Sequence, residues 1–326
     1  MSAPLTDARR EAPRRRVAAA PPLVALALSV LLFLAGGLVQ PGFVNLDQAV
    51  NIVRLAAFLG IVAAGQTLVI IAGGEGIDLS VGNVVTLGAI LTFMVSAGDS
   101  GRLAPAALVA LGAGAVIGGL NGLGIVYLRI PPLVMTLGMA GVVQGAILAI
   151  TQGSIPGGVP PFLARTVTGR LVGVPGIVYL WLAFAVLMWL VLERTPYGRN
   201  LFAIGTNRRT AHLSGVSVPL TVVLTYTLSG LLAALGGLLL LGFTQRVFLS
   251  LGVSYLFPSI AAVVVGGTVL AGGRGSYFGT MAGALVLTMA ESLLRALRLG
   301  EAYQLMVFGL ILVVLLSVYG RQRRVE

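Results

Sequence analysis

The stretch "LVIIAGGEGIDLSVGNVVTLGAIL", residues 68–91, shows how this chain is organised. An apolar run leads into a polar link rich in glycine, and a second apolar run follows at Val84–Val95. Glu75 and Asp78 lie in that link, although the chain has only 10 acidic residues. Ionisable groups at membrane depth are costly and usually face a cavity or a partner. The link is therefore predicted to be a hinge-like break between two membrane-spanning helices.

Composition predicts that the chain is an integral membrane protein. Of 326 residues 57% are hydrophobic and only 10% are charged, with a mean hydropathy of +1.02, which is more apolar surface than a soluble domain of this size needs. A spanning helix takes roughly 20 apolar residues. The sequence predicts an all-α integral membrane protein with about ten such spans. They are 21–39, 50–72, 81–97, 104–127, 132–150, 177–192, 219–242, 255–271, 278–296 and 302–319.

Several kinds of chemistry are excluded by what the sequence lacks. Without cysteine there are no disulfides, thiolate metal sites or cysteine nucleophiles. The single histidine, His212, argues against a histidine-based metal site. All 21 basic residues are arginine, so a Walker A lysine is impossible. The chain is predicted to be no enzyme, to bind no cofactor or metal, and to hydrolyse no ATP.

The arginines predict the orientation. They concentrate at the termini and in short loops, as topology signals do, so the net charge of +11 does not favour nucleic acid as a partner. Two-thirds of them fall on one side if both termini are cytoplasmic. We therefore predict an N-in, C-in topology. Its parts are an Arg-rich tail at 1–20, a single transmembrane domain at 21–320 in contact with lipid, and a tail at 321–326.

Polar residues in the apolar runs and in the link between them are candidates for a translocation path or hinge. Amides and hydroxyls suit a neutral polyhydroxylated solute, whereas an ion-coupled carrier more often needs carboxylates at the midplane. Hydrogen bonding between helices explains the same residues. Asp78 or Ser80 is also expected to cap the helix that begins near residue 81. The candidates are Gln66, Asp78, Ser80, Asn83, Asn121 and Thr136.

Two further features stand out. The polar loop 193–218 contains a short helix predicted at Asn207–Ser214, with Asn207 as its N-cap. The loop is either a solvated segment whose arginines keep it on the cytoplasmic side or a docking surface for a cytoplasmic partner.

In addition, "VIIAGGEGIDLSVGNVVTLGAIL" is echoed later by "AVVVGGTVLAGGRGSYFGTMAGALV". Internal repeats with Gly-interrupted helices are common in transporters, although glycine-rich sequences also match by chance.

Four blocks carry a resemblance to a known family. They are "GQTLVIIAGGEGIDLSVGNV" (65–84), "NGLGIVYLRIPPLVMTLGM" (121–139), "TPYGRNLFAIGTNRRTAHLSGV" (195–216) and "AAVVVGGTVLAGGRGSYFGTMAGAL" (261–285). In this order they resemble the ribose-type sugar permeases of bacterial ABC importers. The resemblance implies a type II importer fold in the inner membrane, paired with a second copy or a paralogue. A separate cytoplasmic ATPase would use ATP and Mg, and a periplasmic binding protein would deliver the sugar.

The resemblance also implies a coupling loop at 193–218 that contacts the ATPase. The residues it marks are Gly198, Arg199, Gly205, Asn207, Arg209, Ala211, Leu213 and Gly215. The loop departs from the family pattern at Thr206, at Arg209-Thr210 where Glu-Ala is usual, and at His212. Three rival functions remain open from the residues: a branched-chain amino-acid permease, a nucleoside permease and an ion-coupled secondary transporter.

Overall fold

The structure is a computed structural model that describes residues 20–300, 302–303, 306 and 309–310. The predicted span 302–319 and the predicted tails 1–20 and 321–326 lie almost wholly outside the described residues. What is described is mostly helical, as expected of an all-α membrane protein.

The helices follow one another with short connections. The first half contains α1 (Ala20–Val39), α2 (Leu46–Ile71), α3 (Val81–Ser96), the 3-10 turn η1 (Ser100–Arg102), α4 (Leu103–Val126), α5 (Pro132–Thr151) and α6 (Pro161–Thr168). A hairpin of two antiparallel strands, β1 (Arg170–Leu171) and β2 (Val174–Pro175), follows. The second half contains α7 (Gly176–Trp189), the π-helical turn η2 (Leu190–Arg194), α8 (Pro196–Thr206), α9 (Arg208–Leu213), α10 (Val218–Thr244), the 3-10 turn η3 (Val253–Tyr255), α11 (Leu256–Val265) and α12 (Tyr277–Ala296).

Seven helices in the described part of the chain are long and apolar enough to cross a membrane, and two shorter apolar helices, α3 and the η3–α11 segment, accompany them. The predicted span 255–271 is too long, because α11 ends at Val265. The residues that follow it form an irregular link in which Gly267, Gly272 and Gly273 have positive φ angles. Such angles favour glycine and interrupt a helix.

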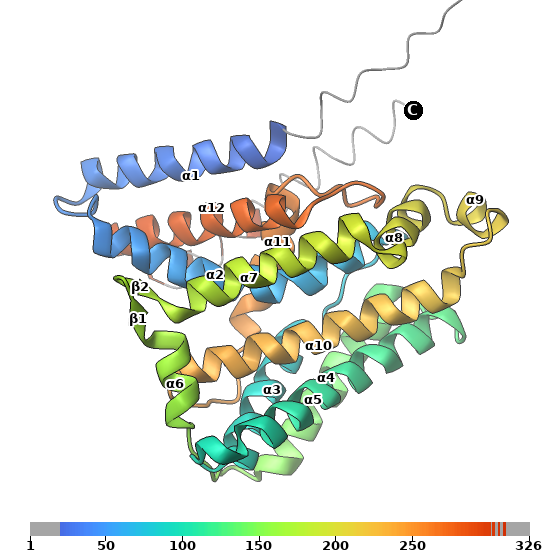
Figure 1. Cartoon of the computed structure of the whole chain (residues 1–326), viewed down its shortest axis with the longest axis horizontal. Helices are drawn as coiled ribbons and strands as arrows, with labels where there is room; N and C mark the ends of the chain where they lie inside the picture. Colours follow the sequence, from blue (N-terminus) through green and yellow to red (C-terminus); the bar gives the residue numbers. More distant parts are fainter. Residues whose placement is uncertain (1–19, 301, 304–305, 307–308, 311–326) are drawn as a thin grey trace, which may run out of the picture.

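Figure 1 shows α10 crossing the middle of the molecule. It packs against α2, α3 and α4, while α1 lies against α12 at the edge. The hairpin and α6 lie at one end of the helices, and α8 and α9 lie at the opposite end. The polar loop 193–218 predicted from the sequence therefore lies at the end opposite the hairpin, although the helices α6 and α8 were not predicted.

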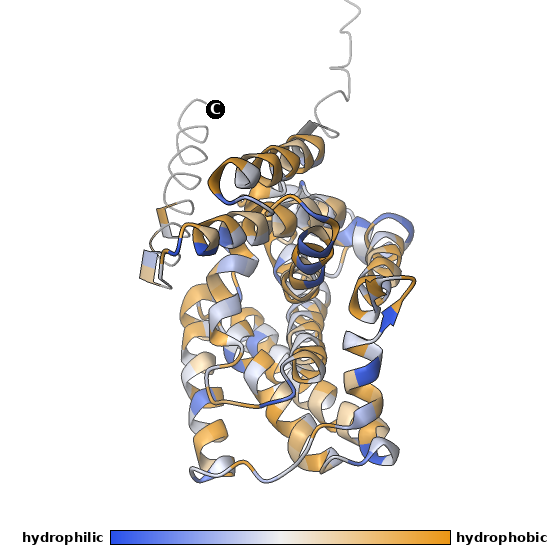
Figure 2. Cartoon of the chain, turned by 90° about the vertical axis from the view of Figure 1, so that its left-hand side faces the viewer, coloured by the Kyte–Doolittle hydropathy of each residue, from blue (hydrophilic) through white to orange (hydrophobic). Residues whose placement is uncertain are grey.

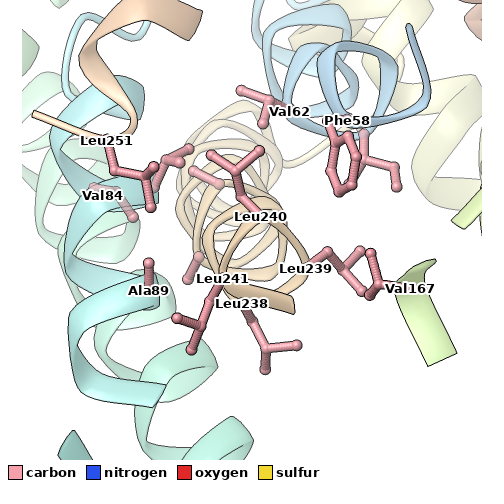
Figure 3. Packing of buried hydrophobic residues seen from close by; sticks show 14 of the residues in the cluster. Phe58, Val62, Val84, Ala89, Val167, Leu238, Leu239, Leu240, Leu241 and Leu251 are labelled. Atoms are coloured by element: carbon pink, nitrogen blue, oxygen red, sulfur yellow. The ribbon is translucent and has the colours of Figure 1, made fainter. Parts of the chain in front are cut away.

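Leucines of α10 form the centre of the largest apolar cluster. Leu238 to Leu241 contact residues of α2, α3 and α6, among them Phe58, Val84 and Val167 (Figure 3). The helical ribbons are predominantly hydrophobic (Figure 2), and many of their large apolar side chains are exposed, such as Leu108 on α4 and Leu137 on α5. An apolar face of this kind fits a hydrocarbon environment.

Glycine brings α4 and α10 into backbone contact. A Cβ at Gly114 would overlap the carbonyl of Gly230, and one at Gly230 would overlap that of Gly114. One turn further along α4, a Cβ at Gly118 would overlap the carbonyl oxygen of Tyr226. Small residues permit this approach, and in lipid the gain is close van der Waals packing.

Replacing Gly118 by valine should therefore separate α4 from α10 and destabilise the purified protein by about 1–3 kcal/mol. Thermal unfolding in detergent measures the change. Gly112→Val is the matched control, because Gly112 lies on the same helix with nothing within 4 Å of an added Cβ. Equal unfolding temperatures for the two variants would contradict the proposed contact.

Candidate functional site

The carboxylate of Asp78 is fully buried in the link between α2 and α3. Its Oδ1 accepts hydrogen bonds from the Ser80 backbone N–H at 3.0 Å and from the Ser80 hydroxyl at 2.6 Å. Its Oδ2 accepts one from the Ser229 hydroxyl of α10 at 2.8 Å. A buried polar group without partners is costly. These three donors explain how an acidic residue is held between two apolar helices.

Side chains of α2 and α4 complete the network. The Gln66 amide donates to the Asp78 carbonyl at 2.6 Å, and its oxygen accepts from the Asp78 N–H at 3.3 Å. The Asn121 amide donates to the Ser80 hydroxyl at 3.0 Å. Gln66 and Asn121 are both fully buried. The link is thus fixed from α2, α4 and α10 at once.

Helix α5 reaches the same link from another side. The Thr136 hydroxyl lies 3.2 Å from the carbonyl oxygen of Ile77. Asn83, in contrast, donates to the Ala140 carbonyl at 2.7 Å and joins α3 to α5 away from this network. Five of the six residues predicted for the path or hinge therefore meet at the link: Gln66, Asp78, Ser80, Asn121 and Thr136.

The expectation that Asp78 or Ser80 caps α3 is wrong. Ser80 directly precedes α3, but its side chain accepts no hydrogen bond from the N–H groups of the first turn. Its hydroxyl donates to Asp78 instead, and the Asp78 carboxylate bonds to Ser80 and Ser229. Contacts within the interior thus take the place of the local cap.

The two acidic residues of the link differ in their surroundings. Glu75 is exposed and adopts a left-handed backbone angle, φ 60°, in the run of turns that starts at Gly73 and Gly74. Asp78 is enclosed. Only one of the two carboxylates thus belongs to the buried network.

Loop 193–218 folds into two helices rather than one. Asn207 accepts a hydrogen bond from the Thr210 N–H at 3.0 Å, which confirms its predicted role as the N-cap of α9. Thr195 caps α8 by accepting from the Gly198 N–H at 3.2 Å. Because Pro196 follows that cap at the first helical position, the start of α8 has a local signature that sequence reasoning missed.

The loop residues that the family resemblance marks differ in how far they are buried. Gly198 and Ala211 are buried, whereas Leu213 is 78% exposed. Arg199, Asn207, Arg209 and Gly215 are exposed as well, and Gly205 is partly buried. Tyr197 fixes α8 to α10 through a 2.9 Å hydrogen bond with Thr225, and burial raises the pKa of its phenol to about 12.

Gly205 sits in a junction of backbones that sequence reasoning did not identify. A Cβ at Gly205 would overlap the carbonyl oxygen of Ile71 and the N–H of Gly273. The Gly273 N–H itself donates to Ile71 at 2.9 Å. Positions 73 and 272 also approach Gly205 through backbone atoms. The end of α8 therefore packs directly on the α2–α3 and α11–α12 links.

The two segments of the sequence echo meet at this junction. Gly73 lies in the first segment, and Gly272 and Gly273 lie in the second. A Cβ at Gly272 would lie 2.5 Å from the Cα of Gly73. Glycines of the two segments thus meet at one place in the fold.

Among the residues that the structure describes, no group of three or more His, Cys, Asp or Glu side chains is placed to hold a metal ion. The polar interior consists of one carboxylate surrounded by amides and hydroxyls. Apart from that carboxylate, the side-chain groups of the network are neutral.

Asp78→Ala should destabilise the purified protein by about 1–3 kcal/mol, because the buried hydroxyl of Ser229 and the groups of Ser80 lose their acceptor. Thermal unfolding in detergent checks this. Glu75→Ala serves as the control, since it removes an exposed carboxylate from the same link and should change stability little. A loss from Glu75→Ala as large as that from Asp78→Ala would contradict the network.

Comparison with known proteins agrees with the family resemblance of the sequence. The family model described as branched-chain amino acid transport system / permease component matches residues 48–316. The ribose import permease protein of Bacillus subtilis is 36% identical over 293 residues, which cover 89% of each chain. The ribose import permease protein of Escherichia coli K12 is 33% identical, and the matched region covers 91% of this chain and 93% of that relative. The fructose import permease protein of Rhizobium meliloti is 32% identical, and the matched region covers 92% of this chain and 84% of that relative.

No solved structure matches the chain. The seven apolar helices and these relatives make it a multi-pass protein of the bacterial inner membrane. With a family match over most of its length, the chain belongs to the permease-component family of branched-chain amino acid transport systems and is a ribose-type ABC permease.

Proposed function

We propose that this chain is the transmembrane subunit of an ATP-binding cassette importer for a monosaccharide or related polyol. The observation that carries the proposal is similarity over about nine-tenths of the chain to ribose and fructose import permeases. The family description mentions branched-chain amino acids, but the relatives are named for sugars. The amino-acid, nucleoside and ion-coupled alternatives are therefore not favoured.

The interior chemistry is consistent with a neutral solute. Gln66 and Asn121 present amides at the α2–α3 link, and Thr136 and Ser229 present hydroxyls. The carbonyl oxygen of Asn121 is buried and has no partner among the described residues. It is the group of this network best placed to accept a further hydrogen bond.

The topology proposed here has ten spans with both termini in the cytoplasm. The permease domain 21–320 would lie between the tails 1–20 and 321–326. The distribution of arginines supports this orientation, and the opposite placement of the 170–175 hairpin and α8–α9 agrees with it (Figure 1). The tenth span would be 302–319.

The proposed partners follow from the importer mechanism. Loop 193–218 would contact a cytoplasmic ATPase, which supplies the site for ATP and Mg. A periplasmic binding protein would deliver the sugar, and a second copy or a paralogue would complete the path. The chain itself is expected to bind no nucleotide, because it has no lysine for a Walker A motif.

Purified chain in proteoliposomes should hydrolyse no ATP and should accumulate no sugar on its own. Adding its ATPase and binding protein should give ATP-dependent uptake of radiolabelled ribose or fructose. An ATPase with its Walker A lysine replaced is the control and should abolish uptake. Uptake by the chain alone along an ion gradient would contradict the proposal.

Leu213→Asp should weaken co-purification of the ATPase about tenfold, because an exposed leucine at the end of α9 is an apolar anchor for a docking partner. Quantitative pull-down from membranes measures the loss. Leu171→Asp is the matched control: Leu171 is 65% exposed but lies at the opposite end of the helices (Figure 1). Equal recovery of the ATPase with both variants would argue against docking at α9.

A further inference from the structure

Arg208, the first residue of α9, reaches from the coupling loop to the α2–α3 link. Its Nη2 donates to the carbonyl oxygen of Gly73 at 3.2 Å. The guanidinium lies against Gly74, where an added Cβ would overlap it. Gly74 also has a φ of +65°, so a residue with a side chain is disfavoured there on two grounds.

The carbonyl that Arg208 binds also organises the link. Gly73 accepts a second hydrogen bond, at 3.3 Å, from the N–H of Gly76. Asp78 lies two residues beyond Gly76, and its carboxylate is bonded to Ser229 of α10. A displacement of α9 would thus reach the buried network through one short turn.

The glycine junction makes this connection short and stiff. Gly205, at the end of α8, approaches the backbones of Gly73 and Gly272 with no side chain between them. Flexible side chains, which would absorb a small displacement, are absent from this contact. Arg208 adds the polar bond that keeps α9 against the same turn.

We propose that Arg208 is a positioning residue that passes movement of the coupling loop to the α2–α3 link and its Asp78 network. This proposal deepens the proposed function and rests on it. Sequence reasoning did not single out Arg208, because its partner Gly73 is 135 residues away in the chain. The structure distinguishes it by the contact with Gly73.

The first experiment tests the contact in the purified chain and needs no transport. Because the chain has no cysteine, Ile77→Cys introduces a single thiol into the partly buried link. Arg208→Ala should raise its rate of maleimide labelling at least threefold, whereas Arg208→Lys, which still donates a hydrogen bond, should raise it less. Arg274→Ala, the loss of an exposed arginine from the neighbouring α11–α12 link, is the control and should leave the rate unchanged.

The second experiment measures coupling in the reconstituted importer. Arg208→Ala should lower the sugar taken up per ATP hydrolysed at least fivefold, and Arg208→Lys should recover at least half of that loss. A variant that is merely misfolded would yield less assembled complex without changing this ratio.

Three results would overturn the proposal. They are an unchanged labelling rate in Arg208→Ala, an unchanged ratio of uptake to hydrolysis, or an equal effect of Arg274→Ala. Failure of the wild-type complex to show ATP-dependent uptake would instead reject the proposed function, and the labelling result would still decide whether Arg208 holds the link.

Discussion

A buried carboxylate must find hydrogen-bond donors, and this requirement shapes the centre of the protein. Asp78 obtains them from Ser80 in its own link and from Ser229 of α10. The Ser80 hydroxyl in turn accepts a hydrogen bond from the amide of Asn121 on α4. In a low-dielectric interior a satisfied polar network favours one arrangement of its members. With Gln66 of α2 and Thr136 of α5, the network therefore ties α2, α4, α5 and α10 to the break between α2 and α3.

Backbone contact through glycine is the second organising element. Along α4 and α10 it brings two long helices together, and at Gly205 it joins the end of α8 to two links. Both contacts depend on the absence of a side chain. The hydrogen-bonded network and the glycine junction share the segment 72–80, so the polar interior and the loop at the cytoplasmic end of the proposed topology are parts of one connected structure.

Much of the helical framework could be predicted because apolar runs are a local signal. The predicted spans 50–72 and 104–127 correspond closely to α2 and α4. The N-cap at Asn207 was also predictable, since the side chain bonds only three residues ahead. Short helices such as α6 and α8 were not predicted, because they are amphipathic and brief. The end of α11 was misplaced because the glycines after it still lie in an apolar run.

The sequence by itself determined that the chain is an integral membrane protein of this family, that a break separates the helices on either side of residues 73–80, and that it has no lysine or cysteine chemistry. Only the tertiary structure decided which groups meet. Asp78 and Ser229 are separated by 151 residues, and Arg208 and Gly73 by 135. Such pairs have no local signature, because they depend on how helices distant in the chain pack. The fold therefore decides which of two neighbouring carboxylates is buried and which is exposed at the surface.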